Sequence, residues 1–184
     1  MSEARVLVVH GGRFGQSAKI AAAMRRTLGE KGLPSDLAPL TARTAIDPSA
    51  HAAVLLVTSV RYGHFDKNAY RLVERNRSWL ETHPAQLVTV SLTARKPEKR
   101  DPQVHSYTKK FLDKSGWKGR VAVVAGALEY PRYNLLDRSM IQLIMRITDG
   151  PTDPSAAIEY TDWDQVAETA QSFAELVSNH PREQ

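Results

Sequence analysis

The sequence contains no cysteine among its 184 residues. Disulfides, thiol catalysis and iron–sulfur ligation are therefore excluded, whereas this absence says nothing positive about the compartment. Long apolar runs are missing as well, since no stretch approaches the roughly 18 residues that span a bilayer. Residues 1–5 lead directly into a strand-like run instead of a signal-peptide core. We therefore expect a cytoplasmic protein.

The rest of the composition is ordinary for a globular protein. Hydrophobic residues make up 42% of the chain and charged residues 24%. A chain of this length can bury a core of its own without covalent or metal cross-links. We expect one domain over residues 1–178, followed by a loose tail over residues 179–184.

Positive charge is concentrated in one stretch of the chain. Residues 95–120 carry nine Lys and Arg against three acids, whereas the whole chain has a net charge of +5. Such a cluster indicates either an anionic partner at one site or a solvated basic helix face. Aromatic residues are not interleaved through the cluster as stacking platforms, so nucleic-acid binding is not expected.

Strand-like and helix-like segments alternate along the chain. Strands are expected at residues 5–9, 33–40, 53–58, 86–92 and 121–128, the second as an edge strand containing Pro34 and Pro39. Helices are expected at residues 18–29, with Ser17 as N-cap, and at residues 68–80, 103–114 and 161–177. This alternation predicts an α/β fold with a doubly wound five-stranded parallel sheet, and its length and order favour the flavodoxin-like arrangement.

An insert interrupts this pattern at about residues 129–155, before a strand-like segment at residues 156–160. Apolar residues cover more than one face of its predicted helix, and Arg132, Arg138 and Arg146 add positive charge. A helix of this kind is either buried in the core or docks on a partner or a membrane surface. The insert therefore indicates either simple core packing or a lipid- or quinone-facing role.

Ligands of doubly wound sheets bind at the carboxyl ends of the strands, where loops 10–17, 58–64 and 91–96 are expected to converge. The glycines of the first loop allow backbone N–H groups and the next helix N-terminus to cradle a phosphate. Gln16 stands where a Walker loop has lysine, and the glycine spacing differs from the dinucleotide fingerprint. The alternative is a plain connection between a strand and a helix.

The other two loops carry an aromatic residue, a histidine and a group of cations. Tyr62 is placed to stack on a flat heterocycle or to anchor its loop. His64 is a candidate for moving protons near neutral pH, or a solvated loop residue. Four cations within residues 95–100 suit carboxylate or phosphate groups, or form an exposed loop without a specific role.

Several strings of residues are similar to one known family. They are Arg61-Tyr62-Gly63-His64, residues 94–100, residues 125–128, Tyr130-Pro131-Arg132-Tyr133, Asp137-Arg138, Leu143-Ile144-Met145 and Tyr160-Thr161-Asp162-Trp163. On these strings the chain resembles, almost from end to end, the flavodoxin-like, FMN-containing protoporphyrinogen IX dehydrogenases of bacteria. The resemblance also implies that the insert is of the long-chain type that interrupts the fifth strand.

The resemblance implies oxidation of protoporphyrinogen IX to protoporphyrin IX through FMN, with menaquinone or ubiquinone as acceptor, in haem biosynthesis. It further implies a peripheral position on the cytoplasmic face of the inner membrane, reached through the basic and apolar insert. We expect no metal site, and no catalytic base is assigned. The chain departs from the family pattern where Gly11 and Gly12 replace the usual hydroxyl residues and where Phe14 replaces a small polar or acidic one. This departure predicts altered phosphate contacts.

The residues of such a site are predicted in three groups. The FMN phosphate is assigned to Gly11, Gly12, Arg13, Phe14, Gly15, Gln16 and Ser17. The isoalloxazine is assigned to Val60, Arg61, Tyr62, Gly63, Ser91, Leu92 and Thr93. The two propionates of the porphyrinogen are assigned to Arg95, Lys96, Lys99, Arg100 and Arg132.

Other functions remain open on the same fold. A flavodoxin-type electron carrier binds FMN without oxidising porphyrinogen, although its acceptor-facing surface is commonly acidic. A flavin-dependent NAD(P)H:quinone reductase needs a nicotinamide site, for which the sequence has no fingerprint. An interaction module without cofactor is suggested only by the altered first loop.

Overall fold

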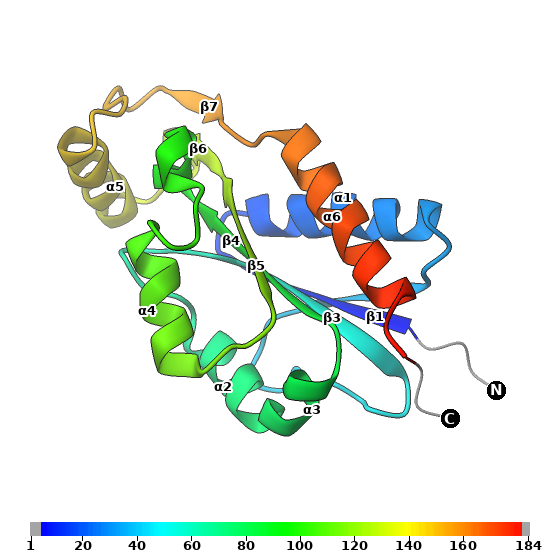
Figure 1. The fold of residues 1–184 in the computed structure, drawn as a ribbon. Helices are drawn as coiled ribbons and strands as arrows, with labels where there is room; N and C mark the ends of the chain where they lie inside the picture. The colour runs from blue at the N-terminus through cyan, green and yellow to red at the C-terminus, as the bar shows by residue number, and fades with distance from the viewer. Residues whose placement is uncertain (1–4, 182–184) are drawn as a thin grey trace.

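A computed structural model describes residues 5–181 of the chain. Its main sheet has five parallel strands in the order β2-β1-β3-β4-β5 (Figure 1). The strands are β1 (Arg5–Gly11), β2 (Ser35–Pro39), β3 (His51–Ser59), β4 (Ala85–Ser91) and β5 (Arg120–Ala125). The predicted flavodoxin-like doubly wound sheet is thus confirmed, with β2 at its edge. Residues 182–184 of the predicted loose tail lie outside the described residues.

Helices cover both faces of this sheet. Helices α1 (Gln16–Glu30) and α6 (Trp163–Ser178) lie side by side on one face, and α2 (Lys67–Arg75), α3 (Arg77–Thr82) and α4 (Ser106–Ser115) cover the other (Figure 1). Every residue of β4 is buried. A central parallel strand with helices on both faces has no solvent-exposed side, which explains its continuous apolar character.

The helix predicted from residue 103 begins at Ser106, and the first two predicted helices also differ from the sequence-based expectation. The helix predicted at residues 68–80 is broken at Asn76, whose side-chain amide donates to the Leu72 carbonyl at 2.7 Å. Ser17 is not an N-cap, because Gly15 takes that position with a φ of 89° and Ser17 lies inside the first turn of α1. Glycine reaches this left-handed conformation without the steric cost that a serine would meet.

The final helix begins at Trp163, two residues after the predicted start at residue 161. The Asp162 side chain accepts a hydrogen bond from the backbone N–H of Gln165 at 3.1 Å, which is the geometry of an N-cap.

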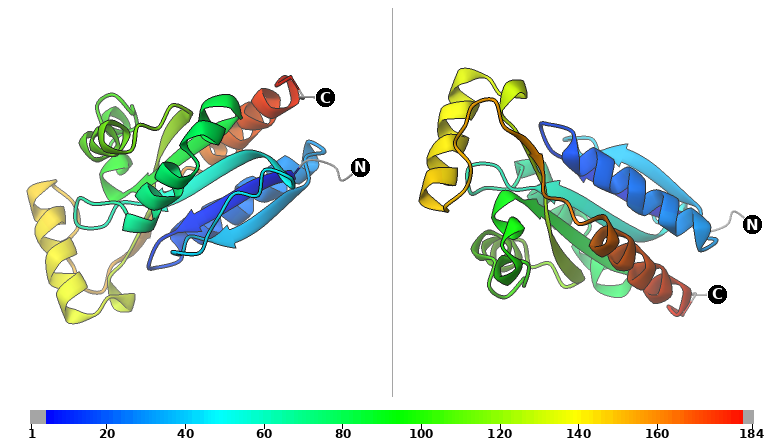
Figure 2. Two further views of the ribbon diagram at one scale, coloured as in Figure 1. Left: turned by 90° about the horizontal axis from the view of Figure 1, so that it is seen from below. Right: turned by 90° about the horizontal axis from the view of Figure 1, so that it is seen from above.

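The insert forms a lobe at the carboxyl edge of the sheet. It contains η3 (Tyr130–Arg132) and α5 (Leu135–Ile147), and it lies between β6 (Ala127–Glu129) and β7 (Ala157–Glu159). Strand β7 pairs antiparallel with β6 in a two-stranded sheet, so the chain does not return to the main sheet after the insert. Figure 2 shows α5 at the end of the molecule opposite both chain ends.

A small apolar core joins the insert to the rest of the protein. It consists of Leu128, Tyr130, Tyr133, Ile141 and Met145, with Phe14 and Leu92 packed against it. Two further 3-10 turns, η1 (Leu92–Arg95) and η2 (Pro97–Lys99), connect β4 to the segment before α4. Across residues 5–181, none of the helices has the length and apolar character that crossing a bilayer requires.

Candidate functional site

The three predicted loops do converge on one cavity at the carboxyl edge of the sheet. Its wall includes residues 12–17 of the first loop, residues 59–63 of the second and residues 90–93 of the third. Of the fourteen residues predicted for the cofactor, all but Gly11 line this cavity, which also receives Tyr107, Gly126, Ala127, Tyr133, Ile141 and Ile144. Gly11 lies at the end of β1 and lines a neighbouring cavity.

The first loop offers hydrogen-bond donors that the protein leaves unused. Gly15 is the N-cap of α1 and provides no side-chain cap, and among residues 5–181 the buried Ser17 hydroxyl has no hydrogen-bond partner. A Cβ at position 12 would lie 2.8 Å from Ser17 Oγ and 2.9 Å from Ser59 Oγ, so a side chain there would collide with both hydroxyls. Uncapped N–H groups beside a buried hydroxyl suit a phosphate.

The second loop is a tight hairpin that places an aromatic ring. Arg61 and His64 exchange two backbone hydrogen bonds of 2.8 and 2.9 Å around Tyr62 and Gly63. Both central residues have positive φ angles, 50° for Tyr62 and 77° for Gly63. This conformation is costly for tyrosine, so the surrounding contacts must hold it. The Arg61 guanidinium lies 4.6 Å from the centre of the Tyr62 ring.

A buried histidine, His105, contacts the third loop from the interior of the protein. Thr93 Oγ1 lies 2.9 Å from Ser91 Oγ and 3.1 Å from His105 Nε2. His105 Nδ1 lies 3.3 Å from the backbone nitrogen of Thr108 and 2.7 Å from Thr108 Oγ1. Burial, together with the charge of Lys99, lowers the pKa of His105 to about 4. A neutral His105 therefore fixes the Thr93 hydroxyl at the cavity wall.

Asp137 ties the insert to two of the three loops. It lies in the first turn of α5 and its side chain is only 1% exposed. Its carboxylate accepts from Arg61 Nη2 at 2.6 Å and from the Tyr62 hydroxyl, and it lies 3.4 Å from Arg13 Nη2. A buried carboxylate is stable only when paired in this way. The same contacts hold the strained Tyr62 in place.

Phe14 has a partner in the insert. Its ring centre lies 4.5 Å from that of Tyr133. Together with Arg13, it makes the first loop part of the contact between the sheet edge and α5. The insert is therefore a wall of the cavity and cannot be regarded as a separate appendage.

The cations predicted for the propionates do not line the cavity. Arg95 Nη2 donates to the Thr148 carbonyl at 2.6 Å, and Lys96 Nζ lies 3.7 Å from Asp149. The other two arginines pair with acids, Arg100 with Asp162 at 3.0 Å and Arg132 with Glu129 at 2.6 Å. The partly exposed Lys99 acts electrostatically on His105. The assignment of all five to substrate stays a prediction.

Sequence reasoning missed Tyr107, Tyr133, Asp137 and the isoleucines of α5. The single acid in the apolar and basic helix Leu135–Ile147 was a signal for Asp137, because such a residue must find a cationic partner when buried. No local pattern distinguishes Tyr107, which packs against Gly63 only through the tertiary fold. Within the described residues no cluster of three or more His, Asp or Glu side chains could hold a metal ion.

The fold is shared with solved flavodoxins. Oxidised flavodoxin 1 from Bacillus cereus superposes with a TM-score of 0.54 at 9% identity, covering 94% of this chain and 98% of that one. The rubredoxin oxygen:oxidoreductase from Desulfovibrio gigas gives a TM-score of 0.54 at 10% identity, covering 96% of this chain and 37% of that one.

Sequence comparison identifies nearer relatives. The model of the flavodoxin domain matches residues 7–155. The protoporphyrinogen IX dehydrogenase (quinone) of Escherichia coli strain K12 is 40% identical over 173 residues, which cover 94% of this chain and 96% of that protein. The protein of the same name from Leishmania major is 47% identical over 124 residues, covering 67% of this chain and 54% of that protein. The chain therefore belongs to the flavodoxin domain family and, within it, to the group of proteins named protoporphyrinogen IX dehydrogenase (quinone).

Proposed function

We propose that this protein holds FMN in the cavity at the carboxyl edge of its sheet, oxidises protoporphyrinogen IX there and passes the electrons to a membrane quinone. The observation that carries the proposal is this cavity, in which an uncapped helix N-terminus and an unpartnered buried hydroxyl lie beside a hairpin with an aromatic ring. The substrate and the acceptor follow from the names of relatives that match over nearly the whole chain.

The residues present fit the cofactor chemically. Ser17 and the first turn of α1 would bind the phosphate, and Gly12 would allow its close approach. The hairpin at Tyr62 and the third loop with Thr93 would flank the flavin ring. Bound FMN supplies the hydride acceptance, while the protein supplies position, electrostatics and exclusion of water.

The insert limits the space for the cofactor. The cavity measures about 120 Å³, whereas pockets for ligands of this kind usually measure about 300–1,000 Å³. Ile141, Ile144 and Tyr133 form its wall on the insert side. These side chains must move outward when the ring binds, so cofactor binding and the position of α5 are coupled.

The visible spectrum of the purified protein tests this function. We expect flavin bands that bleach on anaerobic addition of protoporphyrinogen IX and recover on addition of a quinone. Flavin bands that do not respond to porphyrinogen would indicate an electron carrier, and bleaching by NAD(P)H would indicate a reductase. A protein without flavin bands that also fails to take up added FMN would contradict the proposal.

A substitution at Ser17 tests the place of the phosphate. Ser17→Ala removes a hydroxyl that has no other partner, so FMN affinity should fall by roughly tenfold, the effect of one charge-assisted hydrogen bond of about 1.4 kcal/mol. Ser178→Ala, at the exposed end of α6, is the matched control and should leave the affinity unchanged.

The membrane part of the proposal is supported by the outer face of α5. Leu135, Leu136 and Ile147 are 78%, 82% and 72% exposed, and Met140 and Leu143 continue the same face. Arg132 and Arg146 lie exposed at the two ends of this segment. An exposed apolar stripe flanked by arginines is complementary to an anionic lipid surface, from which a quinone would reach the adjacent cavity.

A further inference from the structure

A second cavity, of about 560 Å³, lies against the first. The two share Gly12, Arg13, Ser59, Arg61 and Tyr62, so the second loop and the start of the first loop form a common wall. The remaining residues of the second cavity are His10, Gly11, Pro39, Leu40, Thr58, His64, Phe65 and Asp66. Its volume is within the range of sites for small organic ligands.

The second cavity has an apolar side and a cationic side. Pro39, Leu40 and Phe65 provide the apolar surface, whereas Arg13 and Arg61 provide two guanidinium groups that are 47% and 41% exposed. Both guanidiniums reach Asp137 through Nη2, and among residues 5–181 neither pairs with a second acid. One buried carboxylate thus faces two arginines, and their other N–H groups are available to a ligand.

Asp66, the acidic residue in the wall of the second cavity, is not an ion-pair partner of Arg13 or Arg61 within residues 5–181. The Asp66 carboxylate accepts from the backbone N–H of Asn68 at 2.7 Å and caps α2. In contrast, the Thr58 hydroxyl is buried in the wall and has no partner within the described chain. A buried hydroxyl without a partner is uncommon in a protein and indicates that a ligand completes its hydrogen bonding.

We propose that this second cavity is the substrate site and that it takes the carboxylate-bearing edge of a largely apolar macrocycle. The inference rests on the proposed function, because the porphyrinogen that the relatives are named for has this chemistry, with two propionates on an apolar ring. Arg13 and Arg61 would bind the carboxylates, and Pro39, Leu40 and Phe65 would contact the ring. The shared wall would then bring the ring next to the cofactor cavity.

The test is carried out on the FMN-loaded protein with protoporphyrin IX and its dimethyl ester as fluorescent probes. We expect the free acid to bind at least tenfold more tightly than the ester, since a charge-assisted hydrogen bond is lost with each esterified carboxylate. Arg13→Gln should weaken binding of the free acid about tenfold and leave the ester unaffected, and Thr58→Val should weaken binding threefold or more. Both variants should raise the KM for protoporphyrinogen, and Thr58→Val, at a residue that does not line the cofactor cavity, should leave FMN affinity unchanged.

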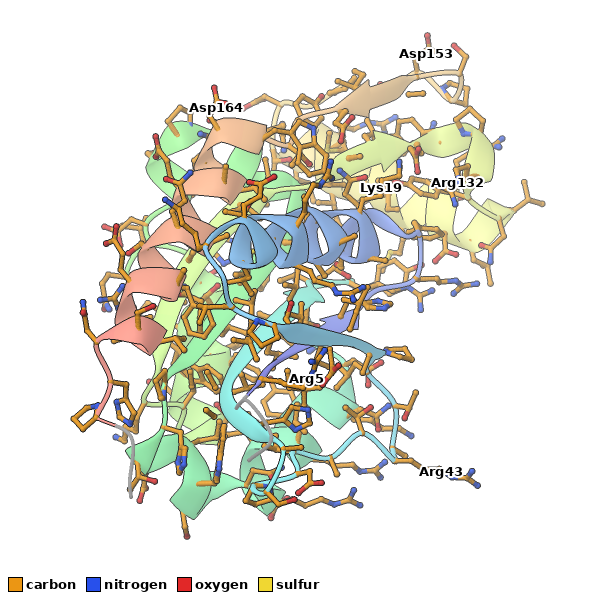
Figure 3. The ribbon with its side chains drawn as sticks, turned by 90° about the vertical axis from the view of Figure 1, so that its right-hand side faces the viewer. Arg5, Lys19, Arg43, Arg132, Asp153 and Asp164 are labelled. Carbon is orange, nitrogen blue, oxygen red and sulfur yellow. The ribbon has the colours of Figure 1, made fainter. Side chains whose placement is uncertain are left out.

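Arg43→Gln is the matched control. Figure 3 shows Arg43 on the loop after β2, extending away from the protein, and it lines neither cavity. It removes the same charge from the same edge of the molecule and should leave both affinities unchanged.

The outcomes separate this inference from the proposed function. If the wild-type protein oxidises protoporphyrinogen but Arg13→Gln and Thr58→Val keep its KM, the site is elsewhere and the function stands. Loss of FMN affinity in Arg13→Gln at constant porphyrin affinity, or an equal effect of Arg43→Gln, would also overturn the inference. Tight and variant-sensitive porphyrin binding without turnover would support the site and contradict the function.

Discussion

At the scale of single residues, His105 illustrates how a buried group supports the site without lining it. It is 2% exposed and lies between Thr93 and Thr108, and Thr108 in turn donates to Thr89 at 3.1 Å. This network fixes the third loop from its inner side. Because burial disfavours the charged imidazolium and Lys99 adds a like charge nearby, the neutral form is strongly preferred.

The depressed pKa of His105 makes the stability of the protein depend on pH. Its folded-state pKa of about 4 is below the ordinary value of 6.5. The unfolded chain therefore binds the proton first, so the stabilisation is complete above pH 6.5 and is lost as the pH falls towards 4. We expect a decrease of about 3 kcal/mol in the free energy of unfolding over this window, measured by urea denaturation at each pH.

Two variants check the origin of this pH dependence. His105→Gln should flatten the curve between pH 4 and pH 6.5, even if the variant is less stable at every pH. His180→Gln, near the C-terminus, should retain the wild-type slope. An unchanged slope in His105→Gln would assign the pH dependence to other groups.

At the scale of elements, α5 is held at both ends by polar contacts with the cofactor loops. Asp137 engages Arg61, Tyr62 and Arg13 at its N-terminal end. Arg95 reaches past its C-terminal end to the Thr148 carbonyl, and it also donates to the Leu92 carbonyl at 3.0 Å. Arg95 therefore connects the third loop to the insert, as Asp137 does for the second.

Asp137→Asn should loosen α5 and lower the stability of the protein. The substitution keeps the shape of the side chain but replaces charge-assisted hydrogen bonds by neutral ones, at a cost of about 1–3 kcal/mol. We expect a lower urea midpoint and faster limited proteolysis within residues 133–150. Asp153→Asn is the control in the same insert, because Asp153 is exposed and extends into solvent in Figure 3. Equal effects of the two variants would show that Asp137 does not secure the helix.

At the scale of the whole molecule, both cavities and the exposed apolar face of α5 lie at one end. Figure 1 and Figure 2 place α5 and the carboxyl edge of the sheet at the end opposite both termini. The exposed apolar face of α5, its arginines and both cavities thus belong to the same pole. A protein with this arrangement can place its redox site against a lipid surface while the rest of the domain stays in water.

Co-sedimentation with anionic phospholipid vesicles tests this orientation. Leu136→Ser should weaken vesicle binding about tenfold or more, because burying one leucine side chain contributes about 1.5–3 kcal/mol. Val104→Ser replaces a residue that is 48% exposed outside the insert and should have no such effect. Raising the salt concentration should reduce binding only in part, since the apolar contribution is not screened. Equal effects of the two variants would contradict membrane docking through α5.

The sequence by itself determined the alternation of strands and helices, the convergence of three loops and the long insert. These features depend on local properties, such as the continuous apolar runs of buried strands and the glycines that follow β1. The convergence of residues 12–17, 60–63 and 91–93 on one cavity was predictable because the order of a parallel sheet places the ends of its strands together.

The tertiary structure alone decided how the insert joins the site. Asp137 meets Arg61 across 76 positions of the chain, and Phe14 meets Tyr133 across a still longer separation. The tertiary structure also decided that Arg95 and Arg100 contact other residues of the protein. It places Arg13 and Arg61, in contrast, in the walls of both cavities. The sequence shows where each arginine charge lies along the chain. Which acid or carbonyl that arginine contacts depends on distant segments, which come within a few ångströms only in the folded protein.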